Sequence, residues 1–189
     1  ILLNKSDLAE ERMNDVWAAY FKEKGYSVVK LNAKKGGGIK SIQGVIQEAC
    51  KEKIERDRKR GILNRPVRAM VVGIPNVGKS TFINALAGKA CAKTGNKPGV
   101  TKGKQWIRLN KNVELLDTPG ILWPKFEDQT VGLRLAWIGS IKDEILNTEE
   151  LAAELTGFLV NSYPDVLKEK YEIEESADGF ENLRGIAES

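Results

Sequence analysis

The run from Gly73 to Thr81, Gly-Ile-Pro-Asn-Val-Gly-Lys-Ser-Thr, constrains the fold of this chain more than any other stretch. It follows an apolar run from Val67 to Val72 that is typical of a strand, and it leads into a helical pattern from Phe82 to Ala87. In this context the backbone N–H groups of a loop and the positive end of a helix converge on phosphate groups. The sequence therefore predicts a phosphate-binding loop. The alternative is an ordinary strand-to-helix turn that matches by chance.

Individual residues of this loop predict how a nucleoside triphosphate is held. Gly73 and Gly78 allow backbone angles and a close approach that a Cβ atom would forbid. We expect Lys79 to reach the β- and γ-phosphates and the Ser80 hydroxyl to bind Mg²⁺. The loop does not specify the base.

The base is predicted by Asn4-Lys5-Ser6-Asp7, which directly follows the apolar run from Ile1 to Leu3. A carboxylate such as that of Asp7 accepts two hydrogen bonds from the N1–H and the exocyclic amine of guanine, whereas adenine offers no such pair of donors. On its own the tetrapeptide is a weak signal, because it could also cap a helix. Its place after a predicted strand favours a base-reading loop.

Composition restricts the class of protein further. The 189 residues suffice for one domain and a small appendage, and the net charge is +4. No apolar stretch approaches the roughly 18 residues of a membrane span, and Cys50 and Cys91 are isolated, so we expect a cytoplasmic protein with reduced thiols and no membrane association. The chain has no histidine for any chemical step. Its first residue is not Met, so we expect it to begin inside a domain.

The segment after the first motif predicts a helix, a strand and a loop. Five apolar residues recur at the spacing of one helix face and are expected to pack in a core: Met13, Val16, Trp17, Tyr20 and Phe21. Gly25 is expected to end this helix, and Tyr26 to Leu31 is the predicted strand. The glycine-rich run from Asn32 to Gly38 lies where a second base-contacting loop is expected, with a simple tight turn as the alternative.

A second helix is predicted from Ile39 to about Arg60, and its end is basic. The cations are Lys51, Lys53, Arg56, Arg58, Lys59 and Arg60, followed by Arg65 and Arg68. Acidic residues are interleaved at spacings suited to i,i+4 ion pairs, so a solvated helix end is the favoured interpretation. Contact with the phosphate backbone of RNA is the alternative.

The part after the phosphate loop carries two more motifs. Thr101 lies in a loop from Gly95 to Gly103, and the runs 105–109 and 113–116 alternate as in a hairpin. In Asp117-Thr118-Pro119-Gly120 a carboxylate ends a buried strand, where it can hold Mg²⁺ through water, and the Gly120 N–H can sense a γ-phosphate. Thr101 and Gly120 are thus expected to form the two loops that a γ-phosphate orders and hydrolysis releases.

These are the motifs of a GTPase in rotated order, with the base-reading loops first (G4-G5-G1-G2-G3). With Gly73 to Ser80, Lys97 to Thr101 and Leu116 to Phe126 in this order, the chain resembles the circularly permuted GTPases and, in particular, the ribosome biogenesis GTPase A family. The resemblance covers residues 1 to about 172, and the run Trp123-Pro124-Lys125-Phe126 is specific to that family.

The resemblance implies an α/β fold. Residues 1–140 would form a circularly permuted, Ras-like P-loop GTPase sheet with helices on both faces, and residues 141–189 the incomplete start of a helical C-terminal domain. Further helices are predicted at Glu127–Ile138, at Thr148–Val160 with Thr148 as the cap, and at Pro164–Tyr171. The acidic run Glu172–Glu181 has no core pattern and is expected to be frayed.

The resemblance also implies a role for each residue that matches a family motif. Guanine contacts are implied for Asn4, Lys5, Asp7, Ala33 and Lys34. Phosphate contacts are implied for Asn76, Val77, Gly78, Lys79, Ser80, Thr81, Thr101 and Gly120, of which Lys79, Thr101 and Gly120 are the implied catalytic residues. Ser80, Thr101 and Asp117 are the implied Mg²⁺ ligands, and Asn76 is implied to hold a K⁺ ion beside the phosphates.

The implied function is that of a GTP-hydrolysing switch required late in assembly of the large (50S) ribosomal subunit. It would use GTP or GDP, Mg²⁺ and K⁺, act as a monomer, and be activated by that subunit and its rRNA. One alternative is a guanine-nucleotide binding module without useful turnover. Another is a small-subunit assembly GTPase, but those relatives carry an N-terminal barrel and a Cys/His zinc element that this sequence does not display.

The chain departs from the family pattern in two ways. Ile121 stands where Ras-like enzymes carry a Gln that orients the attacking water, and the family histidine proposed for that task is absent. Relatives also have a strand ahead of Asn4 that lies between the phosphate-loop strand and the base-reading strand. We therefore expect either a gap inside the sheet or direct pairing of the two flanking strands, and we favour a fragment with the gap.

Overall fold

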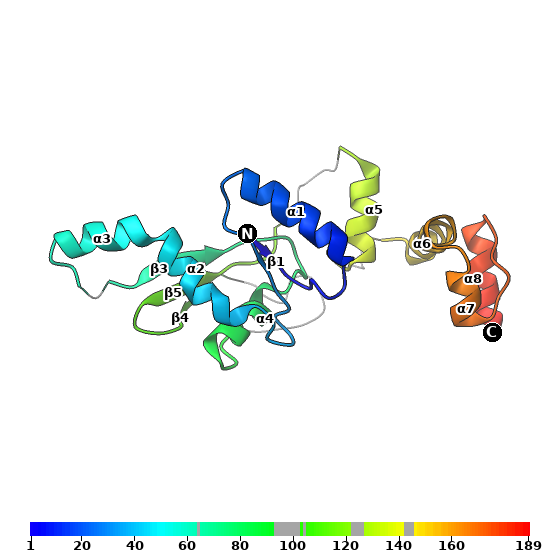
Figure 1. Ribbon diagram of the computed structural model, residues 1–189. Helices are drawn as coiled ribbons and strands as arrows, with labels where there is room; N and C mark the ends of the chain where they lie inside the picture. The colour runs from blue at the N-terminus through cyan, green and yellow to red at the C-terminus, as the bar shows by residue number, and fades with distance from the viewer. Residues whose placement is uncertain (64, 93–102, 104, 122–126, 142–145) are drawn as a thin grey trace. The chain divides into compact units, whose positions relative to one another are not determined.

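The structure is a computed structural model that describes residues 1–63, 65–92, 103, 105–121, 127–141 and 146–189 (Figure 1). The chain divides into two compact units, Ile1–Leu122 and Trp123–Ser189. The predicted domain boundary between residues 140 and 141 stays a prediction. Thr101 and the run from Trp123 to Phe126 lie outside the described residues.

The described residues of the first unit form two separate small sheets. In one, β1 (Leu2–Leu3) pairs in parallel with β2 (Val29–Lys30). In the other, the strand order is β3-β5-β4, with β5 (Val113–Asp117) parallel to β3 (Val67–Val71) and antiparallel to β4 (Gln105–Arg108). No pairing joins β1 to β3 in the described part of the chain, so the expected gap is present and direct pairing of these flanking strands is wrong.

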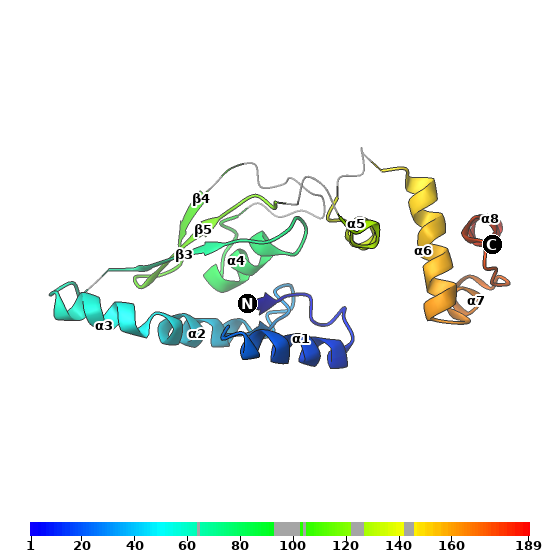
Figure 2. The same ribbon diagram turned by 90° about the horizontal axis from the view of Figure 1, so that it is seen from above.

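The core of the first unit lies on one face of the three-stranded sheet. Helix α4 (Lys79–Ala87) packs there together with the short 3-10 helix η1 (Ile39–Ser41) and α2 (Ile42–Ala49), on the same side of the sheet in Figure 2. Leu31, Ile83 and Leu115 are among its most buried side chains. The predicted long basic helix is interrupted at Cys50, after which α3 (Lys51–Lys59) carries the basic residues.

The aromatic stripe on the first helix was predicted to be core, and this prediction is wrong. Helix α1 (Glu11–Glu23) buries Ala18, whereas Trp17 is 51% exposed and Met13, Val16 and Tyr20 are also exposed. Trp17, Tyr20 and Phe21 pack against one another instead, with ring centroids 5.3–5.8 Å apart. The helix touches the small β1–β2 sheet through its opposite side, where Lys30 forms ion pairs with Glu11 and Asp15. Gly25, with a φ of +83°, follows the helix end as expected.

The second unit is helical. It contains α5 (Gln129–Trp137), α6 (Thr148–Ser162), α7 (Val166–Tyr171) and α8 (Gly179–Glu188). The cap of α6 is Asn147 and not Thr148, because the Asn147 side chain accepts a hydrogen bond from the Glu150 N–H. The Trp137 indole N–H donates to the Leu151 carbonyl and links α5 to α6.

The acidic run from Glu172 to Glu181 was expected to be frayed, and it is ordered. Asn182 is 1% exposed; it accepts from the Ser176 N–H and donates to the Ser176 carbonyl. Burial tends to raise the pKa of Glu175, but hydrogen bonds from backbone N–H groups, including those of Asp165 and Leu167, outweigh it and lower this pKa overall. Polar side chains therefore hold a segment that has no apolar periodicity.

Across the described ranges, every helix is too short or too polar to traverse a lipid bilayer.

Candidate nucleotide-binding site

The predicted phosphate loop lies between β3 and α4, and two of its residues have left-handed backbone angles. Gly78 caps the N-terminus of α4 with a φ of +88°, and Asn76 has a φ of +58°. A Cβ atom at Gly78 would lie 2.5 Å from Asn4 Nδ2. Glycine at position 78 is thus required both by the left-handed backbone and by the close approach of Asn4.

Lys79 lies over the loop from which it extends. Its Nζ donates hydrogen bonds to the carbonyl oxygens of Gly73 (3.0 Å) and Ile74 (2.8 Å). Burial lowers the pKa of Lys79 below its ordinary value, and the nearby Asp117 carboxylate opposes this shift. The ammonium group is therefore partly removed from water and directed along the loop, where an anion would restore its preference for the charged form.

Asp117 ends β5 next to the loop, as predicted for a carboxylate at a strand end. It is 1% exposed, and the Ser80 hydroxyl donates to its Oδ2 at 3.2 Å. Its Oδ1 is buried and accepts no hydrogen bond from the residues that the structure describes. A buried carboxylate oxygen without a partner is costly, and a water-bound divalent cation would satisfy it.

Gly120 and the phosphate loop touch through their backbones. A Cβ atom at Gly120 would lie 2.6 Å from both Pro75 N and Pro75 Cα, so a larger residue here would displace the loop. The Thr118 hydroxyl donates to the Val71 carbonyl oxygen (2.7 Å) and fixes this segment to the end of β3. Ile121 is 74% exposed, and its side chain offers no hydrogen-bonding group.

The two predicted base loops meet the phosphate loop at Asn4. Its Nδ2 donates to the Val77 carbonyl oxygen (2.8 Å), and its Oδ1 accepts from the Ala33 N–H (3.0 Å). Val77 and Asn4 are 73 positions apart in sequence, so one side chain joins three separate segments. The structure thus brings together Asn4, Ala33, Val77 and Gly78, for which the resemblance implied guanine or phosphate contacts.

Asp7 is the more open part of this region. Its side chain is 34% exposed and forms an ion pair with Lys35 at 3.4 Å. Lys5 is exposed with a φ of +55°, and Lys34 is exposed in the neighbouring loop. Thr81 lies half-buried on α4. Thr101 cannot be placed, because it lies outside the described residues.

Sequence reasoning missed three contacts in this region. The pairing of Lys35 with Asp7 had a weak signal, since Lys35 lies within the glycine-rich run predicted as the second base loop. The packing of Gly120 against Pro75 had none, because the two residues belong to motifs that are more than 40 positions apart. Thr118 was seen only as a member of its motif, and its bond to β3 was not foreseen.

The strand, loop and helix, with a buried carboxylate beside them, define a P-loop nucleotide-binding protein. The sequence profile of the 50S ribosome-binding GTPases matches residues 68–183, which is more than half of the chain. The chain belongs to this family.

Curated relatives agree with that assignment. Ribosome biogenesis GTPase A of Bacillus cereus is 53% identical over 183 residues, which cover 97% of this chain and 62% of that protein. The protein of the same name from Priestia megaterium is 51% identical over 184 residues, which cover 97% of this chain and 64% of that protein. The chain therefore spans less than two thirds of the length of these relatives.

The fold prediction is confirmed by a solved structure. The GDP-bound structure of TM YlqF is similar with a TM-score of 0.58 and 26% sequence identity, covering 98% of this chain and 74% of that one. The α/β, circularly permuted P-loop GTPase fold and the resemblance to the ribosome biogenesis GTPase A family are thus correct.

Proposed function

We propose that this chain carries the GTP-binding and GTP-hydrolysing switch of a cytoplasmic protein required for late assembly of the large (50S) ribosomal subunit. The observation that carries the proposal is the bridge made by Asn4. Its side chain hydrogen-bonds both the phosphate loop and the second base loop, so a guanine motif and a phosphate motif belong to one site.

In this proposal the base end selects guanine. The Asp7 carboxylate accepts from the N1–H and the exocyclic amine, while Asn4, Lys5, Ala33 and Lys34 shape the pocket around the ring. Asp7 exchanges its exposed ion pair with Lys35 for these two hydrogen bonds. An exposed ion pair is weak, so this exchange costs little.

At the phosphate end, Asn76 through Thr81 surround the phosphates, and Lys79 contacts the β- and γ-phosphates. Ser80 and Asp117, with Thr101, hold Mg²⁺; the buried, unsatisfied Oδ1 of Asp117 fits a metal-bound water. The ion neutralises charge that develops on the transferred phosphoryl group. Asn76 is the proposed ligand of a K⁺ ion, and Thr101 and Gly120 respond to the γ-phosphate.

Ile121 cannot orient the attacking water, so the proposal requires a group from outside the described residues or from the ribosomal subunit. This is why we propose that large subunits and their rRNA, acting on a monomer, stimulate hydrolysis. The exposed Ile121 also favours the second candidate, a guanine-nucleotide binding module without useful turnover.

The test is GTP hydrolysis in potassium and in sodium buffer, alone and with purified large or small subunits. Stimulation by large subunits, stronger in potassium, is the expected result. Binding of GTP but not ATP, with no hydrolysis under any condition, would favour the binding module. Stimulation by small subunits alone would instead assign the protein to assembly of the small ribosomal subunit.

A further inference from the structure

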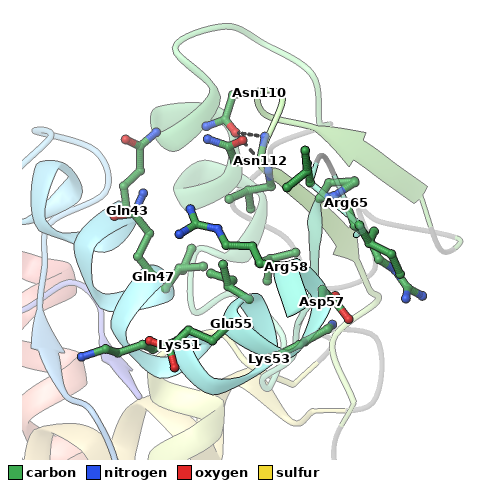
Figure 3. Close-up of a pocket in the computed structure, with 17 residues that line it drawn as sticks. Gln43, Gln47, Lys51, Lys53, Glu55, Asp57, Arg58, Arg65, Asn110 and Asn112 are labelled. Atoms are coloured by element: carbon green, nitrogen blue, oxygen red, sulfur yellow. Dashed lines mark hydrogen bonds between the residues drawn. The ribbon is translucent and has the colours of Figure 1, made fainter. Parts of the chain in front are cut away.

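A hollow lies at the end of β3 that is remote from the phosphate loop. Its walls come from α2, α3, the start of β3 and the turn between β4 and β5, and its volume is about 430 Å³ (Figure 3). Its lining includes apolar side chains such as Ile46, Ile54 and Val113. We call this hollow the basic groove, for the reasons that follow.

Positive charge dominates the lining of the basic groove. The cations are Lys51, Lys53, Arg58 and Arg65, against the two carboxylates of Glu55 and Asp57. Within the described chain, none of these six residues forms an ion pair. The spacing of the five that lie on α3 would allow such pairs between them. The same helix carries Arg56 and Lys59, and Arg60 follows as its C-cap; all three are exposed. Helix α3 buries no residue, in agreement with the favoured interpretation of a solvated helix end, but the ion pairs that its spacing would allow are not formed among the described residues.

Polar amides complete the lining. Gln43 and Gln47 come from α2, and Asn112 from the opposite turn, with Arg58 extending across the groove between them (Figure 3). The turn is held in shape because Asn110 Oδ1 accepts from the N–H groups of Asn112 (2.8 Å) and Val113 (3.0 Å). Amides both donate and accept hydrogen bonds, so they match a ligand that also does both.

A ribonucleotide strand has this chemistry. Its phosphates accept from arginine in a bidentate manner, and its 2′-hydroxyls both donate and accept. An acidic peptide matches the cations equally well, and its backbone amides also donate and accept. RNA is favoured because the chain belongs to the 50S ribosome-binding GTPases, and a ribosomal subunit presents RNA.

The basic groove is separate from the candidate nucleotide site. Val67, at the start of β3, lines the groove, whereas the phosphate loop follows Val71 at the other end of the strand. Four residue steps of about 3.3 Å give roughly 13 Å between the two ends. RNA and nucleotide can therefore be bound at the same time, and each can be lost without the other.

We propose that the basic groove binds the phosphate backbone of RNA. The proposal rests on the proposed function in one respect, because the large ribosomal subunit supplies the RNA. It assigns the RNA contact to Lys51, Lys53, Arg58 and Arg65, outside the nucleotide site.

The experiment measures the affinity of the chain for a labelled RNA hairpin at several salt concentrations. Arg58→Gln with Arg65→Gln removes two groove charges, and Arg12→Gln with Lys22→Gln on α1 removes two exposed charges elsewhere. We expect the groove variant to bind RNA at least about tenfold more weakly and its salt slope to fall by about 2. The α1 variant should keep the wild-type affinity and slope. Both variants should bind a GTP analogue as the wild type does.

Wild-type affinity in the groove variant would overturn the proposal, whatever the GTP result. If polyglutamate displaced the labelled hairpin as well as unlabelled RNA of matched charge did, the ligand of the groove would be an acidic protein and the RNA proposal would be wrong. A second readout needs no variant: acetylation of Lys51 and Lys53, but not of Lys22, should be suppressed by the RNA hairpin. Loss of GTP binding with RNA binding intact would instead contradict the proposed function and leave the groove assignment standing.

Discussion

The phosphate end and the base end of the candidate site are built differently. At the phosphate end one contiguous run, Gly73 to Thr81, joins a strand directly to a helix, and Asp117 beside it is 1% exposed. At the base end two loops from different parts of the chain approach each other, and the Asp7 side chain is 34% exposed. In the described residues, the Asn4 side chain is the hydrogen-bonded link between the two ends.

The comparison shows which contacts hold each end of the site in place. The phosphate end is fixed by local covalent continuity and by the burial of Asp117. The base end depends on one amide and on side chains that are in contact with water. We therefore expect substitutions at the phosphate end to abolish binding and those at the base end to change selectivity.

The largest expected effect is that of Lys79→Ala. Its ammonium group makes charge-assisted contacts with two phosphates in the proposed complex, so affinity for GTP should fall by about 3 kcal/mol, or roughly 100-fold. Titration with a fluorescent GTP analogue measures this loss. Lys89→Ala, at an exposed lysine just beyond α4, is the matched control and should bind normally. A variant Lys79→Ala with normal affinity would contradict the proposed phosphate site.

The next effect separates the two ends by selectivity. Asp7→Ala should weaken GTP binding by about 1.5–3 kcal/mol, because two hydrogen bonds to a charged acceptor are lost, and should leave weak ATP binding unchanged. Competition between GTP and ATP for the same labelled analogue measures the ratio. Lys35→Ala removes the partner of Asp7 at 3.4 Å and should change affinity by less than about 1 kcal/mol. Full GTP affinity in Asp7→Ala would exclude the base-reading role.

A smaller effect tests the link itself. Gly78→Ala and Gly88→Ala both place an alanine at a positive φ, of +88° and +65°, which costs about 1–2 kcal/mol of stability. A Cβ at Gly88 meets nothing within 4 Å, whereas one at Gly78 meets Asn4 Nδ2 at 2.5 Å. Gly78→Ala should therefore be the more destabilising in urea unfolding, and the excess should disappear in an Asn4→Ala background. Equal losses for the two glycines would mean that Asn4 does not crowd the loop.

The smallest effect concerns the unliganded chain. The folded state lowers the pKa of Lys79 from 10.5, so its charged form destabilises the fold at neutral pH. Lys79→Met should then be more stable than the wild type, by less than about 1 kcal/mol because the group is partly exposed. The charged Lys79 lowers the free energy of unfolding by its full amount below the pKa of the folded state, and this loss disappears as pH rises from that pKa toward 10.5. The stability advantage of Lys79→Met over the wild type should therefore shrink in alkaline buffer. A gain that does not change between pH 7 and alkaline pH would point to packing instead of charge.

Local patterns predicted the phosphate end and the hairpin well. β3, β4 and β5 lie within one residue of the predicted limits, and α4 ends at Ala87 as predicted but begins three residues earlier, at Lys79. These features depend on neighbours in sequence. The exposure of Trp17 could not be predicted, because periodicity tells which residues share a helix face and not whether another element covers that face.

Features that depend on polar contacts or on contacts between distant residues could not be predicted from the sequence either. The acidic C-terminal run is ordered by Asn182 and Glu175, whose hydrogen bonds leave no apolar signal. The motif at Asn4 to Asp7 was recognised. Its hydrogen bond to Val77 was not predicted, because Asn4 and Val77 are 73 positions apart in sequence. The predicted role of Thr101 stays a prediction.

The gap between the two sheets of the first unit has a consequence for heat resistance. A guanine nucleotide would lie across this gap, with its base beside the loop after β1 and its phosphates beside the loop after β3. The bound ligand would then connect the two sheets and stabilise the folded unit. The melting temperature would therefore rise with nucleotide concentration. At a free concentration of 100 times Kd, the added stability is about 2.7 kcal/mol. The cellular supply of guanine nucleotide would thereby set how long this unit survives unfolding and proteolysis.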